Sequence, residues 1–178
     1  MRSTATDAPN LRRAVKAAYR MRDTYDCGRL WFDPFIIPST EKLLRVCRYT
    51  TFCERHGLEY GEFMQTVPSP DGFTLRDEKR YIIIYNDAPH IPVARKRFTL
   101  AHELGHYALR HQEDGDRQEQ EADCFARNLL APRLVAIKHD IDFPDYPKVF
   151  GISAAAARMC ERMRDDDERL AAGLYPIK

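Results

Sequence analysis

The sequence predicts an α+β protein that is mostly helical, with a small β-sheet or hairpin packed on one central helix. Three observations support this fold class. Several stretches carry apolar side chains at helical spacing. Two short runs between residues 73 and 85 are rich in β-branched and aromatic residues. The length of 178 residues suits a single domain with one core.

Two helices are predicted in the first third of the chain. The first covers residues 10–24, where Asn10 can act as the N-cap. Its apolar face contains Leu11, Val15, Ala18 and Tyr19. After an extended connector over residues 27–38, a second helix is predicted to begin at a cap on Ser39 or Thr40 and to end at Gly57. Its apolar face would contain Leu43, Leu44 and Cys47.

A β-hairpin is predicted next, with strands over residues 73–76 and 80–85. We expect Ile82 and Ile84 to build the core, because alternate residues of a strand point to the same side, and Ile83 and Tyr85 to face elsewhere. The alternative is that residues 80–85 form a sheet edge whose free backbone groups hold a substrate in extended form.

The remainder is predicted to be helical. Helices are expected from about residue 92 to 111 and from 118 to 130, where Ala131-Pro132 ends the second of them. The apolar face of this second helix contains Cys124, Phe125, Leu129 and Leu130. A loop over residues 139–147 precedes a helix from Ser153 to Met163, and the aspartates of residues 165–167 are expected to be solvated.

These elements suggest one domain over residues 1–178 with three parts. Residues 1–35 are expected to form an N-terminal helical extension, residues 39–132 the core, and residues 133–178 a C-terminal helical tail.

Composition limits the partners. The 28 Lys and Arg nearly balance the 27 Asp and Glu, so the net charge of +1 provides no field for nucleic acid or an anionic membrane. The sequence predicts neither a secretory signal nor a transmembrane run. The five cysteines include no C-x-x-C pair, which argues against disulfides and a cysteine zinc site. We therefore expect a cytoplasmic protein.

The most informative motif is H-E-x-x-H, formed by His102, Glu103 and His106 within a predicted helix. Residues four apart share a helical face, so both imidazoles can bind one metal ion, with Glu103 beside them. Zn²⁺ is the cofactor that this pattern favours. A catalytic zinc site needs one more protein ligand and an open position for water.

The helix over residues 118–130 can provide that ligand. Glu119 and Asp123 are four apart, so one can bind the metal while the other orients a zinc-bound histidine. Glu121 is the rival ligand, but it lies about 200° around the helix from Glu119. On this argument, replacing Glu121 should affect metal binding little.

The chemistry that follows is hydrolysis. Zinc held by two imidazoles and a carboxylate lowers the pKa of bound water toward about 7, and Glu103 can act as general base. A second donor for the oxyanion is expected, but no residue is singled out among Tyr107, His111, His90 and Arg97, for which packing or surface roles are favoured. Surface positions are also expected for His56 and His139.

The run RFTLAHELGHYALRH, with IIIYND before it and EQEADCFARNLLAP after it, resembles the ImmA/IrrE-type zinc metallopeptidase family. The resemblance covers about residues 39–132 and implies a zincin-like fold of the gluzincin kind. It implies His102, His106 and Glu119 as zinc ligands and Glu103 as general base; Asp123 stands where the family often has Asn. It also implies a cytoplasmic endopeptidase whose protein partner is a helix-turn-helix repressor.

Two other functions compete with this interpretation. One is a metal-binding regulatory module that binds the repressor without proteolysis; the intact Glu103 argues against it. The other is a DNA-binding regulator, suggested by the Gly-Ile-Ser turn before a helix in residues 149–163. That segment has few basic residues and is followed by three aspartates, so a packing helix is favoured.

Overall fold

The computed structural model describes residues 8–25, 29–77, 80–113 and 115–174. Cys27, the turn residues Glu78 and Lys79 of the predicted hairpin, and the first seven residues of the predicted extension lie outside the described residues. Within these ranges, no helix combines the length and the apolar character needed to cross a lipid bilayer.

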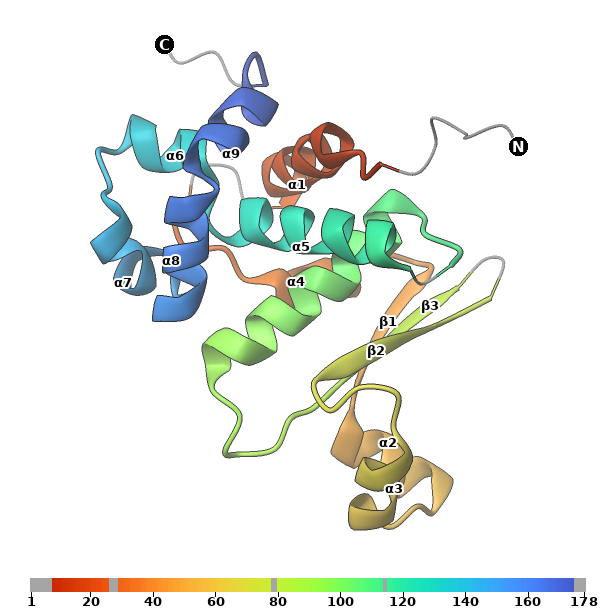
Figure 1. Cartoon of the computed structure of the whole chain (residues 1–178). Coiled ribbons are helices and arrows are strands. Elements are labelled where there is room, and N and C mark those ends of the chain that lie inside the picture. Colours follow the sequence, from red (N-terminus) through yellow and green to blue (C-terminus); the bar gives the residue numbers. More distant parts are fainter. Residues whose placement is uncertain (1–7, 26–28, 78–79, 114, 175–178) are drawn as a thin grey trace.

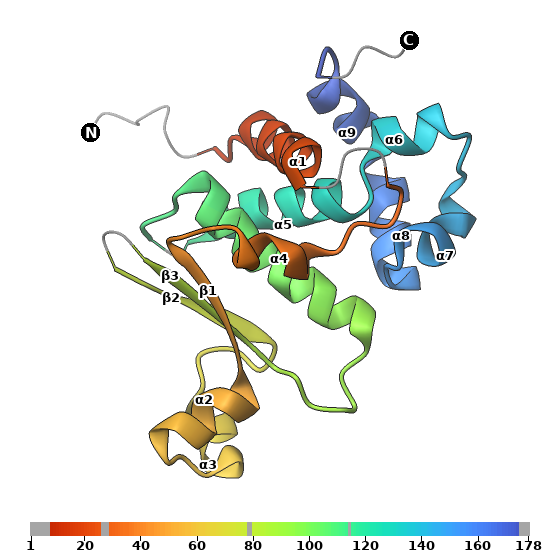
Figure 2. The same cartoon turned by 180° about the vertical axis from the view of Figure 1, so that it is seen from behind.

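Helix α4 (Val93–Leu109) lies at the centre, with helices on one side and a small sheet on the other (Figures 1 and 2). Helices α5 (Asp116–Leu130) and α1 (Leu11–Tyr25) pack above it, and the sheet lies below. The predicted α+β fold class, mostly helical with a small sheet against the H-E-x-x-H helix, is confirmed.

The sheet has three strands in the order β1-β3-β2. Strands β2 (Gly72–Arg76) and β3 (Tyr81–Tyr85) form the predicted antiparallel hairpin. Strand β1 (Leu44–Arg48) pairs with β3 in parallel, with Leu44 opposite Tyr81. The central strand is therefore β3, and β2 is an outer strand.

The predicted helix from residue 39 to 57 is wrong in its first half. The chain forms a 3-10 helix η1 (Pro34–Ser39), then β1, then α2 (Tyr49–His56) and α3 (Tyr60–Thr66). Backbone pairing with β3 prevails over the apolar periodicity that suggested a helix. The predicted stop is confirmed, because Gly57 ends α2 in the left-handed conformation with φ 64°.

The expected alternation in β3 is also wrong in part. Ile82 is exposed, whereas Tyr81, Ile83, Ile84 and Tyr85 are all buried. Tyr81 and Ile83 belong to the core cluster, so the side of the strand that faces the core is the opposite of the expected one. Ile84, on the other side, is buried as well, between its strand neighbours Cys47 and Phe73. The core contains Ile83, together with Val15, Leu100, Leu104, Phe125 and Leu129 from α1, α4 and α5.

The C-terminal part consists of short helices that close over α1 and α5. They are α6 (Arg133–Lys138), the 3-10 helix η2 (Phe143–Asp145), α7 (Tyr146–Phe150), α8 (Ala154–Arg162) and α9 (Arg164–Ala171). Ser153 caps α8 as predicted.

The expectation that residues 165–167 are all solvated is wrong for Asp167. This residue is 3% exposed and accepts two hydrogen bonds from Arg127 of α5, at 2.8 and 2.9 Å. A buried cation on a neighbouring helix therefore determines its position. The division of the chain into extension, core and tail stays a prediction.

Candidate metal centre

One face of helix α4 packs in the core, and another face carries the two histidines of the motif. Leu100, Ala101 and Leu104 are fully buried in the core. His102 and His106 stand four residues apart on another face, and their Nε2 atoms are 3.1 Å apart. The spacing that the sequence suggested therefore brings both imidazoles together.

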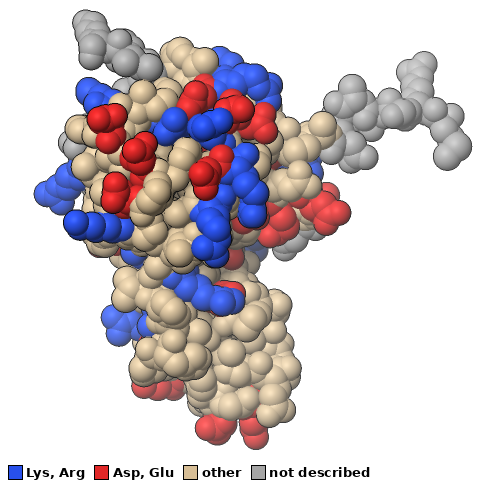
Figure 3. Space-filling model, turned by 60° about the vertical axis from the view of Figure 1, so that its left-hand side comes forward, with Lys and Arg blue, Asp and Glu red and all other residues tan. Residues whose placement is uncertain are grey.

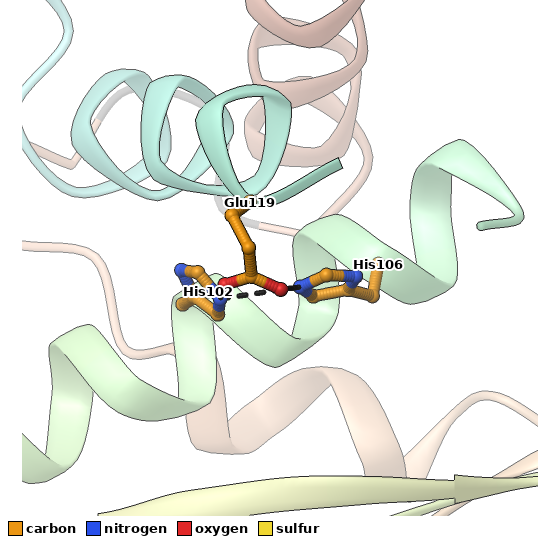
Figure 4. A group of neighbouring side chains, drawn as sticks. All are labelled: His102, His106 and Glu119. Carbon is orange, nitrogen blue, oxygen red and sulfur yellow. Dashed lines mark hydrogen bonds and ion pairs between the residues drawn. The ribbon is translucent and has the colours of Figure 1, made fainter. Parts of the chain in front are cut away.

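Helix α5 brings a carboxylate to the two histidines (Figure 4). Glu119 places Oε2 3.2 Å from His102 Nε2, and Oε1 3.4 Å from His106 Nε2. The two helices approach closely at Gly105, where a Cβ atom would lie only 3.0 Å from the Cα atom of Ala122. A larger residue at position 105 would push α5, and Glu119 with it, away from the histidines.

His102, His106 and Glu119, which we call the ligand triangle, bring their ligand atoms close enough together for a metal ion. The two Nε2 atoms are 3.1 Å apart, and one oxygen of Glu119 lies 3.2 Å from His102 Nε2 while its other oxygen lies 3.4 Å from His106 Nε2. Ligand bonds of about 2.0–2.2 Å in tetrahedral geometry require edges of about 3.3–3.6 Å. His102, His106 and Glu119 therefore fit a four-coordinate ion. Because the Glu119 side chain is 50% exposed, the fourth position can open to solvent.

Asp123 lies one helical turn beyond Glu119 and contacts the opposite nitrogen of His102, with Oδ1 2.8 Å from Nδ1. Burial lowers the pKa of His102, but the hydrogen bonds with Asp123 and Glu119 outweigh it and raise the pKa to about 10. The carboxylates thus favour positive charge at this position. Asp123 is placed where the sequence argument expected it.

Glu121 points away from the ligand triangle. Its Oε2 lies 3.0 Å from His111 Nε2, and its Oε1 accepts a hydrogen bond from the backbone N–H of Asn10 at 2.7 Å. Burial raises the pKa of this carboxyl, but the hydrogen bonds from Asn10 and His111 lower it further, to below its ordinary value. The structure thus places Glu119 and Glu121 on different partners, as their angular separation predicts.

Glu103 faces the cleft that contains the histidines. It is 8% exposed, and its Oε2 accepts a hydrogen bond of 2.6 Å from the hydroxyl of Thr74 on β2. The cleft has a volume of about 500 Å³ and is lined by β2, by α4 and by Glu119. The sheet edge beside the site is therefore β2, and the hypothesis that residues 80–85 form that edge is wrong.

The other histidines, Tyr107 and Arg97 lie away from the cleft. Tyr107 donates to Glu41 at 2.8 Å, and Arg97 is buried against the backbone carbonyls of Phe32 and Phe150. The packing role expected for them is confirmed. Exposed positions, as expected, are found for His56, His90 and His139.

Sequence reasoning missed Thr74 and the contacts of His111. Thr74 carries no signal of its own, because its role depends on β2 crossing beside α4. His111 lies only five residues after His106, the last residue of the H-E-x-x-H motif. This short separation could have identified His111 as a partner of His106.

Comparison with protein families gives one match. The family model Peptidase_M78, described as the IrrE N-terminal-like domain, matches residues 53–172. The chain belongs to this M78 peptidase family. Membership supports a metallopeptidase with a bound metal, on an α+β zincin-like fold. Searches of curated proteins and of solved structures gave no match.

In this family member, the match includes β2, α4 and α5, which contribute residues to the cleft, and it continues through α6 to α9. The resemblance that the H-E-x-x-H region suggested is confirmed at the level of the family.

Proposed function

We propose that this chain is a cytoplasmic, zinc-dependent endopeptidase that cleaves a partner protein, and that the partner is a helix-turn-helix transcriptional repressor. The observation that carries the proposal is the meeting of three ligand atoms and one buried carboxylate, Glu103, at a single cleft. The repressor rests on the family resemblance alone.

The residues suit hydrolysis of an amide bond. A zinc ion held by His102, His106 and Glu119 would lower the pKa of bound water and polarise the carbonyl group of the substrate. Glu103 would accept the proton from water and donate it to the departing nitrogen. The Thr74 hydroxyl donates to one oxygen of Glu103, which fixes the orientation of this carboxylate in the cleft.

The outer strand β2 suits an extended substrate. Among the residues that the structure describes, β2 pairs with β3 on one side and with no strand on the other. Its residues line the cleft beside Glu103. A peptide could therefore pair with the backbone of β2 and pass the ligand triangle in extended form.

A second hollow continues from the cleft and can take an apolar side chain of that peptide. It has a volume of about 600 Å³ and shares Asp71, Phe98 and Thr99 with the cleft. Its floor and walls are mainly apolar side chains of α4, α5 and α8, including Leu130, Ala156 and Met159. A hollow of this size supports binding of a protein segment.

Charge does not favour the DNA-binding alternative. On the face shown in Figure 3, basic and acidic side chains are interspersed over the upper part of the molecule. In α8, Ala157 and Cys160 are buried against the rest of the protein, as in a packing helix. A groove-reading helix would instead need a basic, accessible face.

The deciding variant is Glu103→Gln. Its amide oxygen can still accept from Thr74, and the three ligands are unchanged, but it cannot accept the proton from water. We expect wild type and Glu103→Gln to hold about one zinc per chain, and His106→Ala to lose most of it. Elemental analysis of the purified proteins measures this.

To test activity, wild type and Glu103→Gln are each co-expressed with a candidate helix-turn-helix repressor, and the length of the repressor is followed. Wild type should shorten the repressor, whereas Glu103→Gln should bind it and leave it intact. Equal cleavage with both proteins would contradict the role of Glu103. A stable complex without cleavage by wild type would support the regulatory module instead.

A further inference from the structure

Nδ1 of His106, the ring nitrogen that faces away from the ligand triangle, contacts another histidine. His106 Nδ1 lies 3.1 Å from Nδ1 of His111, and the two rings meet edge to face with their centroids 5.0 Å apart. Both rings are buried, at 3% and 6% exposed. One of the two nitrogens must donate and the other accept, because each neutral imidazole carries a single N–H.

The contacts beyond His111 determine that direction. Asn10 contributes a backbone N–H, which can only donate, to Glu121 Oε1 at 2.7 Å. The second oxygen of the same carboxylate lies 3.0 Å from His111 Nε2. A carboxylate accepts on both oxygens, so His111 Nε2 carries its proton and donates to Glu121. Glu121 is 4% exposed, which shields this bond from competing water.

The proton positions then follow one by one. Because the proton of His111 is on Nε2, its Nδ1 accepts. His106 must therefore donate from Nδ1, and its Nε2, which faces His102 and Glu119, keeps a free electron pair. That is the form of imidazole that binds a metal.

We propose that His111 and Glu121 are positioning residues that fix the tautomer of His106 and thereby prepare its Nε2 for the metal. The inference rests on the metal site of the proposed function and adds two residues to it. It also revises the expectation from sequence that Glu121 matters little to metal binding.

The two histidine ligands are thus oriented in different ways. His102 contacts a carboxylate directly, that of Asp123, whose side chain is 59% exposed. His106 is connected to the carboxylate of Glu121 through His111, and all three of these residues are buried. Both arrangements hold a proton on Nδ1 and turn Nε2 toward Glu119.

Glu121→Gln tests the proposal because it reverses the chain of hydrogen bonds. The amide oxygen must face the N–H of Asn10, so the amide NH₂ faces His111 Nε2 and makes it an acceptor. His111 then donates from Nδ1 to His106 Nδ1, and the proton of His106 moves to Nε2, where the metal would bind. We expect zinc affinity to fall about 10–100-fold, measured by competition with a chromophoric chelator. Glu113→Gln, the same change at an exposed position, should leave the affinity unchanged.

A second measurement needs no variant. Nitrogen-15 NMR of histidine-labelled wild-type protein with zinc should show His106 protonated at Nδ1 and His111 protonated at Nε2. The opposite tautomer of either ring would overturn the proposal, as would unchanged zinc affinity in a folded Glu121→Gln protein. If wild type binds no zinc at all, the proposed function fails, and NMR of the zinc-free protein still tests the His111 tautomer.

Discussion

Thr74 links the outer strand of the sheet to the candidate general base. Its hydroxyl donates to Glu103 at 2.6 Å, and both residues line the same cleft. This hydrogen bond fixes the orientation of the carboxylate, and a fixed orientation favours proton transfer. Strand β2 therefore contributes a side chain that orients Glu103.

Replacing Thr74 with Val should slow catalysis without removing the metal. The two side chains have nearly the same shape, so the change deletes the hydrogen bond and little else. A hydrogen bond to a charged group contributes about 1.5–3 kcal/mol, which corresponds to a fall in kcat of about 10–100-fold. The measurement is kcat on a cleaved peptide, together with zinc content. Thr66→Val, at an exposed position on α3, is the control and should match wild type.

The sequence could predict the residues whose geometry is local. His102 and His106 meet because four residues make about one helical turn, and Asp123 follows Glu119 by the same rule. Thr74 and His111 could not be predicted in the same way. Their partners depend on where β2 crosses α4, and on how the chain after α4 turns back on His106.

At the scale of elements, α4 and α5 were predictable because each carries a continuous apolar face over more than three turns. Strand β1 was not, since five residues give too short a pattern to separate strand from helix. Strand β1 pairs with β3, in which Tyr81, the residue opposite Leu44, lies 37 positions further along the chain. This pairing is visible only in the folded sheet.

The contact between α5 and α9 gives a prediction at this scale. Asp167 is the buried partner of Arg127 and also accepts from Asn128 at 3.1 Å. Asp167→Ala would leave the buried guanidinium without its counter-ion, so the free energy of unfolding should fall by about 3–5 kcal/mol. Asp165→Ala, whose side chain is 87% exposed, should change it by less than about 0.5 kcal/mol. Urea unfolding of both variants checks this, and equal effects would contradict the buried ion pair.

For the molecule as a whole, Arg97 joins three distant segments. Its guanidinium donates to the backbone carbonyls of Phe32, Phe150 and Gly151. It also lies over the ring of Trp31, with Cζ 4.4 Å from the ring centroid. The connector before the sheet and the turn before α8 are thereby attached to the helix that carries the histidines.

Gly151→Ala should disrupt this attachment. Gly151 has φ 63°, and a Cβ atom there would lie 2.5 Å from Arg97 Nη1 and also meet the indole of Trp31. Gly57 has nearly the same φ, 64°, but open space around it, so Gly57→Ala carries the backbone cost of about 1–2 kcal/mol alone. We expect Gly151→Ala to lose about 1–3 kcal/mol more in the free energy of unfolding. Similar thermal unfolding of the two variants would argue against the close packing at Gly151.

The hydrogen bond between Asn10 and Glu121 joins positions 111 residues apart and has a consequence for the order of folding. Contacts of such long range form late, because a large loop must close before they contribute. During synthesis on the ribosome, α1 emerges well before α5, so His111 and Glu121 take up their final positions only after α5 has been made and has packed against α1. We therefore expect an emerging chain that ends before α5 to be unable to hold its metal tightly.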